Sequence, residues 1–198
     1  MNNTIVIKTE LIVISMILML LNCSDGNKTM KMQDPIDIKA TSWDTATIKD
    51  LINLLGKPID SLPEIKKYEK KGKEVVYEYD PEYNWFAVKY LYQNKLQMKV
   101  ESNWVNKNIV NRVTLYSNEI IEGEVYVGQT LGNIRNLIGN KISSPDGYLF
   151  VTLDKYLEIA IELDISDIPN TSPLYYGAGS ISEFPESLKI SSIVIMKR

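Results

Sequence analysis

Acidic side chains are the residues of this chain with the clearest capacity for chemistry. Asp154, Glu158 and Glu162 lie in or next to one predicted strand at residues 156–164. Paired carboxylates can perform general acid and base catalysis, so a carboxylate-dependent hydrolase is one interpretation. Glu158 and Glu162 also alternate with apolar residues, which is typical of the solvated face of a sheet. We favour this second interpretation.

Other catalytic groups are scarce in the sequence. It has no histidine and one cysteine, Cys23, which excludes Ser-His and Cys-His pairs, the usual zinc sites and internal disulfides. No Ser-x-x-Lys, Gly-x-Ser-x-Gly or glycine-rich phosphate motif occurs. The sequence does not exclude a calcium site with oxygen ligands, although no EF-hand spacing is present among Asp146, Asp154, Asp164 and Asp167. We expect no cofactor, no metal and no enzymatic activity.

An uninterrupted apolar segment occupies residues 11–21. As a helix it would be roughly 16 Å long, about half of the ~30 Å that a membrane-spanning helix must cross. This length, with Lys8 before it, is typical of a secretory signal peptide at residues 1–22. The alternative is a buried helix or strand of the mature domain, with Cys23 as a small apolar residue.

The segment ends in Leu20-Leu21-Asn22-Cys23, which resembles the lipobox of bacterial lipoproteins. The resemblance implies cleavage before Cys23 and acylation of that cysteine, palmitate included. Asn22 departs from the family, which usually has Gly, Ala or Ser there. Ser24, in place of Asp, implies the outer membrane over the inner one. The implied location is therefore the bacterial cell envelope, with a lipid anchor in the outer membrane and the domain facing the periplasm.

The charge of the chain is close to balanced, with 22 Lys and Arg against 25 Asp and Glu, a net charge of −3. Binding to nucleic acid requires clustered Lys or Arg. The one basic run, at residues 66–73, is interspersed with Glu64, Glu69 and Glu74, which is typical of a solvated surface. We therefore expect the membrane lipid and a protein as partners, and no nucleic acid.

After the lipidated cysteine, residues 23–42 have the polar composition of a tether. The rest is predicted to be α+β, with two helix-plus-antiparallel-sheet repeats at residues 43–120 and 121–198 forming one compact unit. Thr47 caps a predicted helix at 48–55 that ends at Gly56. Thr130 and Gly139 stand at the matching positions 83 residues later. An internal duplication explains this match, and so does chance agreement between two helices that end in glycine.

Strands are predicted at 74–80, 85–93, 95–102 and 109–117 in the first half, and at 148–154, 156–164 and 188–196 in the second. The predicted strand at 95–102 has the clearest alternation, with Leu96, Met98 and Val100 pointing inward. Hairpin turns are expected at Asn94-Lys95 and at Asp154-Lys155.

One further motif connects these elements to a family. Val127-Gly128-Gln129-Thr130, followed by a short helix that ends in Leu137-Ile138-Gly139, resembles the Gly-x-Thr helix-Gly element of the β-lactamase inhibitor protein superfamily. That group includes small outer-membrane assembly lipoproteins, and its tandem members carry two helix-plus-sheet repeats. The leading Gly is missing from the first copy, where Asp44 and Thr45 stand. The resemblance implies binding through an open sheet face and protruding loops.

Aromatic residues on a long loop are the first candidates for partner binding. The loop at 166–187 is rich in Pro and Gly and carries Tyr175, Tyr176 and Phe184. The alternative is that the two tyrosines fold back as a lid over the core. Trp104 is predicted to be exposed in a turn. Glu158 and Glu162, on the polar face of their strand, complete the candidate set.

Together these features predict a non-enzymatic, lipid-anchored envelope protein that binds and inhibits another protein, of the immunity or inhibitor type. One alternative is a structural or assembly lipoprotein of the outer membrane, which the same resemblance permits. The second alternative is the carboxylate-based envelope hydrolase.

Overall fold

The computed structural model describes residues 42–77, 82–118, 121–122 and 124–197. The predicted signal peptide, Cys23 and nearly all of the tether lie outside these residues. All described residues belong to the structural unit Ile38–Arg198. Among them, no helix has the length and apolar character needed to cross a membrane.

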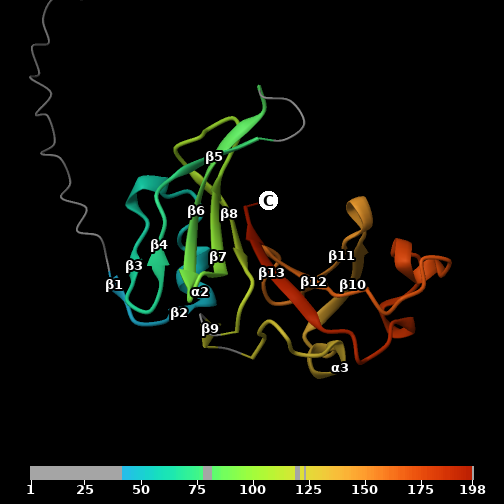
Figure 1. Ribbon diagram of the computed structural model, residues 1–198. Helices are drawn as coiled ribbons and strands as arrows, with labels where there is room; N and C mark the ends of the chain where they lie inside the picture. Colours follow the sequence, from blue (N-terminus) through green and yellow to red (C-terminus); the bar gives the residue numbers. More distant parts are fainter. Residues whose placement is uncertain (1–41, 78–81, 119–120, 123, 198) are drawn as a thin grey trace, which may run out of the picture. The chain divides into compact units, whose positions relative to one another are not determined.

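One antiparallel sheet of nine strands organises the described residues (Figure 1). The strands follow the order β10-β11-β12-β13-β8-β7-β6-β4, and β5 also pairs with β6. The earlier strands are β4 (Glu69–Lys70), β5 (Glu74–Tyr77), β6 (Asn84–Tyr92), β7 (Lys95–Ser102) and β8 (Val110–Leu115). The later ones are β10 (Ile138–Ser143), β11 (Leu149–Leu153), β12 (Ile159–Leu163) and β13 (Ile190–Met196). The two halves of the chain therefore meet where β8 pairs with β13.

Two smaller strand pairs lie outside the main sheet. In the first, β1 (Ser42–Trp43) pairs in parallel with β3 (Glu64–Ile65). In the second, β2 (Ala46–Thr47) pairs in parallel with β9 (Ile121–Glu122). The second pair links the start of α2 to the segment that connects the two halves of the sheet.

Helices make up little of the described chain, which holds α2 (Ile48–Ile52) and α3 (Leu131–Ile134), with five and four residues. Four 3-10 turns are present as well: η1 (Ile59–Ser61), η2 (Pro145–Gly147), η3 (Pro173–Tyr176) and η4 (Ile181–Glu183). The fold is mainly β. The predicted α+β class with two helix-plus-sheet repeats is therefore wrong.

The error comes from helix length, because the predicted helix start is confirmed. Thr47 is the N-cap of α2 and forms a capping box with Asp50, in which each side chain accepts from the other residue's backbone N–H. The helix ends at Ile52, and residues 53–56 form turns instead of another helical turn.

The two glycines matched in the predicted duplication have different conformations. Gly56 has a φ of +82°, as expected of a glycine that follows a helix. Gly139 lies inside β10, and its φ is not positive. Thr130 is the N-cap of α3 but makes no side-chain capping hydrogen bond. The sequence match at these positions therefore does not correspond to a structural match.

The alternation predicted for the sheet is confirmed except at Leu96, which is half-buried and outside the hydrophobic cluster, and it places the core on one face. Met98 and Val100 of β7 are fully buried, as are Ile159 and Ile161 of β12. They belong to one hydrophobic cluster that also includes Leu51 of α2 and, from α3, Leu131 and Ile134. The helices thus cover this face of the sheet, which we term the core face.

The hairpin between β6 and β7 turns one residue earlier than predicted. Tyr92 pairs with Lys95, so the turn consists of Gln93 and Asn94, with φ values of +50° and +63°. Two consecutive positive φ values define the type I′ turn, whose twist matches that of the flanking strands. Lys95 accordingly belongs to β7 instead of to the turn.

Candidate functional site on the open face of the sheet

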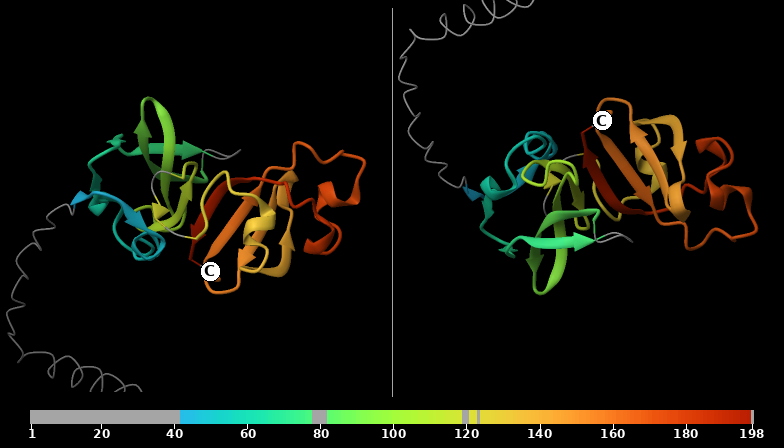
Figure 2. Two further views of the ribbon diagram at one scale, coloured as in Figure 1. Left: turned by 90° about the horizontal axis from the view of Figure 1, so that it is seen from below. Right: turned by 90° about the horizontal axis from the view of Figure 1, so that it is seen from above.

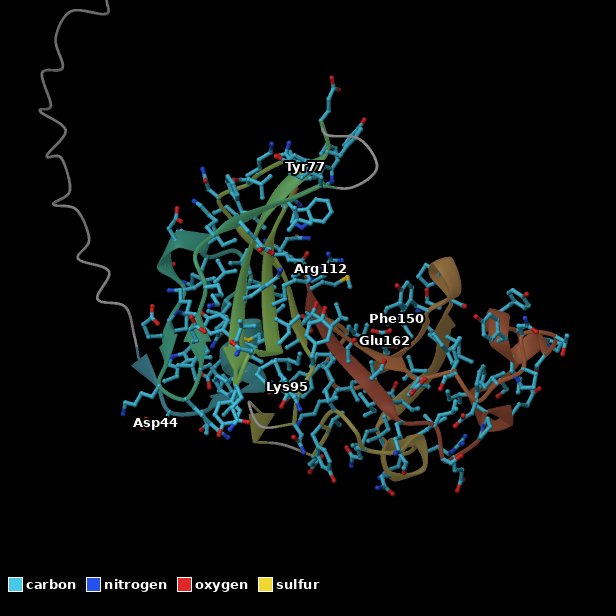
Figure 3. The ribbon with its side chains drawn as sticks, viewed as in Figure 1. Asp44, Tyr77, Lys95, Arg112, Phe150 and Glu162 are labelled. Carbon is cyan, nitrogen blue, oxygen red and sulfur yellow. The ribbon has the colours of Figure 1, made fainter. Side chains whose placement is uncertain are left out.

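The face of the sheet opposite the core carries polar and aromatic side chains, and we term it the open face. Strand register defines it, because Val88, Val100 and Val113 are buried on the core face and their neighbours along each strand must point the other way. Figure 3 shows Arg112, Glu162 and Phe150 on this side. Its main members are Trp85, Lys89, Lys99, Glu101, Arg112, Tyr116, Phe150, Glu162, Ser192 and Met196.

Glu101 is the most deeply buried charge among the described residues of this face, with 1% of its surface exposed. Its Oε2 accepts a 2.8 Å hydrogen bond from Nε of Arg112. Its Oε1 accepts a 3.0 Å bond from Nε1 of Trp85 and lies 3.2 Å from Nζ of Lys99. Burial alone would raise the pKa of Glu101, but the hydrogen bond and charge of Arg112, helped by Trp85 and Lys99, hold it below its ordinary value. The carboxylate is therefore ionised and fully paired.

A second polar group lies further along the same face. The hydroxyl of Ser192 donates to the carboxylate of Glu162, and the two residues face each other across β12 and β13. Tyr116 follows β8 on the side of the sheet where Ser192 lies. Burial and the negative charge of Glu101 raise the pKa of Tyr116. Its phenol thus stays protonated at neutral pH.

Two hollows flank Met196 at the end of β13. One, of about 250 Å³, includes Trp85, Trp104 and Arg112 in its lining. The other, of about 630 Å³, includes Ile142 and Phe150. Met196 borders both hollows, so the open face is hollowed on both sides of the β8–β13 seam.

The predicted loop residues have divergent environments. Phe184 is 2% exposed and belongs to the core, so its ring is not accessible on the surface. Tyr175 is half-buried and packs against the core, whereas Tyr176 is 67% exposed. Their rings make an edge contact with centroids 5.3 Å apart. The segment lies at the β10 end of the sheet (Figure 2). Tyr176 alone is left as an accessible loop candidate.

The remaining candidates are spread over the sheet. Trp104 is 56% exposed, which confirms its predicted exposure, and its ring contacts that of Tyr83 with centroids 5.5 Å apart. Glu158 is exposed just before β12, and Glu162 is half-buried on the open face. The structure brings Trp104 next to Arg112 but does not group it with the two glutamates or Tyr176. Whether these residues bind a partner stays a prediction.

Glu158 and Glu162 do not lie at the spacing of a catalytic carboxylate pair. Glu158 and Glu162 are four residues apart along a nearly extended segment, roughly 13 Å at strand spacing. Carboxylate pairs in glycoside hydrolases lie about 5–9.5 Å apart. Within the described residues, no cluster of three or more acidic side chains could hold a metal ion.

Sequence reasoning missed the pairing of Glu101 with Arg112. Both are charged residues at outward positions of consecutive strands, which is the available signal. Their register follows from a β-bulge after Glu101, which the sequence does not reveal.

Comparison with known proteins adds information on the fold only. No protein-family model and no curated protein matches the sequence. The crystal structure of the uncharacterized protein yfeY from Escherichia coli is similar, with a TM-score of 0.50 and 11% sequence identity. The similarity covers 79% of this chain and 99% of that one. The described residues thus define a mainly β protein built on one antiparallel sheet with a polar, aromatic open face.

Proposed function

We propose that this chain is a lipid-anchored bacterial envelope protein that binds another protein through the open face of its sheet and inhibits it. The observation that carries the proposal is the composition of that face. Aromatic residues, Met and Arg are enriched at protein interfaces, and here Trp85, Trp104, Arg112, Phe150 and Met196 gather around two hollows.

The proposed anchor is supported by the sequence of the N-terminal segment. The apolar run at 11–21 is followed by Cys23 in a lipobox-like context and by a polar tether-like stretch. A lipid on Cys23 would hold the domain at the outer membrane, where the partner would be a periplasmic or envelope protein. A Cys23→Ser variant is expected to lose palmitate labelling and to leave the membrane fraction.

The experiment that tests the function places a photoreactive phenylalanine analogue at single aromatic positions in the native bacterium. Tyr116 and Trp104 report on the open face, Tyr126 is an exposed control outside it, and Tyr176 reports on the loop. We expect one partner to be captured from Tyr116 and Trp104 and not from Tyr126. Capture from Tyr176 alone would indicate that the interface lies on the loop instead of the open face.

Inhibition is then measured on the captured partner. Its activity should fall as the purified protein is added, and a Cys23→Ser form should inhibit equally well in solution. A partner whose activity is unchanged would instead favour the assembly role, in which binding has a structural purpose. Failure to capture any protein from the open face would overturn the proposal.

A further inference from the structure

Arg112 is fixed in place by the buried carboxylate of Glu101. The 2.8 Å bond from Nε uses one edge of the guanidinium, and Glu101 is itself held by Trp85 and Lys99. The side chain of Arg112 remains 41% exposed. A charged side chain that is partly exposed yet held by a buried partner loses little conformational freedom when it binds a ligand.

The other edge of the guanidinium is free in the part of the chain that the structure describes. Nη1 and Nη2 of Arg112 make no hydrogen bond to any described residue, and the closest contact of the guanidinium with Glu101 is the one from Nε. Two parallel N–H groups at this edge match the two oxygens of a carboxylate. The arrangement therefore presents an unused bidentate donor.

Arg112 lines the hollow of about 250 Å³ on the open face. Trp85 and Trp104 supply aromatic walls, Asn103 contributes a polar side chain, and Met196 closes the side toward β13. A hollow of this size accommodates the end of one side chain. The aromatic walls would cover its methylene groups while the charge meets Arg112.

Local charge selects the type of anion. Lys99 and Arg112 carry two positive charges, and Glu101 carries one negative charge, so the cluster has a net charge of about +1. A singly charged carboxylate is neutralised by this cluster. A phosphate dianion would keep an excess negative charge next to the buried Glu101.

We infer that the hollow beside Arg112 is a binding site for a carboxylate, namely the side chain of an Asp or Glu on the protein partner. The inference rests on the proposed function for the identity of the carrier. The site itself is a property of this chain and can be tested without the partner.

The test uses N-acetyl-glutamate amide as the probe and the purified full chain. The indole N–H signal of Trp85 is followed by NMR, because that group donates to Glu101 and is sensitive to any change at Arg112. The expected result is a saturable shift with a millimolar dissociation constant. Sodium chloride at equal ionic strength should produce no saturable shift. If sodium chloride shifts the Trp85 indole signal as much as the probe does, the proposed site is wrong.

Two variants separate binding from folding. Met196 lies opposite Arg112 in the register of β13 and β8, so Met196→Glu places an internal carboxylate against the free edge of the guanidinium. Met196→Gln is the matched neutral control. We expect Met196→Glu to abolish the saturable shift, whereas Met196→Gln should retain one and bind the probe at least about tenfold more tightly than Met196→Glu does. Equal affinities in the two variants would overturn the inference.

Arg112→Lys keeps the positive charge but loses the two parallel N–H groups of the guanidinium. It should weaken probe binding by about tenfold or more. Further probes identify the source of the carboxylate. N-acetyl-alanine, which carries only a terminal carboxylate, should bind no tighter than N-acetyl-glutamate amide, and inorganic phosphate should bind more weakly than both. Tighter binding of either would overturn the assignment to an acidic side chain. Because the probes need no partner, a failed titration refutes the site and leaves the cross-linking test of the proposed function intact.

Discussion

Arg135 and Phe184, 49 residues apart in the chain, are joined by a 3.1 Å hydrogen bond from Nη2 of the guanidinium to the backbone carbonyl. Nη1 of the same group donates to the carbonyl of Ile181 at 2.9 Å. The C-cap residue of α3 thus holds the segment around η4 against the sheet. The long loop predicted at 166–187 is therefore a docked part of the fold, and it carries Phe184 into the core.

Removal of the two hydrogen bonds from Arg135 should loosen the segment around η4 without unfolding the sheet. Arg135→Met keeps an unbranched apolar stem and loses both hydrogen bonds, so we expect the free energy of unfolding to fall by about 2 kcal/mol. Limited proteolysis should show faster cleavage within residues 166–187. Arg135→Lys keeps the charge and one donor group. Its rate of proteolytic cleavage should lie between those of the wild type and Arg135→Met. Unchanged cleavage in Arg135→Met would show that burial of Phe184 alone holds the segment.

Aromatic residues of this segment should separate into a structural and a surface group. Phe184→Ala removes a fully buried ring and should cost about 3–5 kcal/mol of unfolding free energy. Tyr176→Ala, at an exposed position with one ring contact, should cost less than about 1 kcal/mol. Chemical denaturation measures both.

The same comparison decides how the loop is tested for binding. Because Tyr175 packs against the core, a double Tyr175 and Tyr176 variant would mix stability with binding. Tyr176→Ala is therefore the variant to use. A stability loss for Tyr176→Ala as large as that for Phe184→Ala would identify Tyr176 as part of a lid.

Glu101 should make the stability of the protein dependent on acid pH. Its pKa is lower in the folded protein than the value of about 4.3 expected when unfolded, so its ionised form stabilises the fold. This contribution is fully present above the unfolded pKa and is lost as the pH falls through the folded pKa. Glu101→Gln should cost about 2 kcal/mol at neutral pH, since Arg112 and Lys99 lose their buried partner.

The measurement is the unfolding free energy of both proteins as a function of pH. The difference between wild type and Glu101→Gln should shrink as the pH falls below about 4. A difference that stays constant with pH would show that packing, and not charge, accounts for the loss.

Local patterns were sufficient for part of the fold. The Thr47 cap and the alternation in β7 are confirmed because each depends on a few neighbouring residues. Burial of Glu101 was not predictable, because its partners Trp85 and Arg112 come from two other strands and a bulge sets their register. Phe184 lies in a Pro- and Gly-rich segment that looks exposed in sequence. Its backbone carbonyl is bound by Arg135, which lies far away in the chain.

Gly56 and Gly139 occupy matching positions in the predicted duplication, and substitutions at both test whether the two glycines have the same structural role. Gly56 has open space around the position of a Cβ atom but a φ of +82°, so Gly56→Ala should lose about 1 kcal/mol through backbone strain alone. At Gly139 the φ is ordinary, and a Cβ would lie 2.6 Å from Oδ1 of Asp154, an exposed carboxylate that can rotate away. Gly139→Ala should therefore change the unfolding free energy by less than about 0.5 kcal/mol. If it costs more, Asp154→Ala in the same chain should restore the loss. Equal losses at the two glycines, with no rescue, would show that Gly139 is constrained as strongly as Gly56 and would contradict this account.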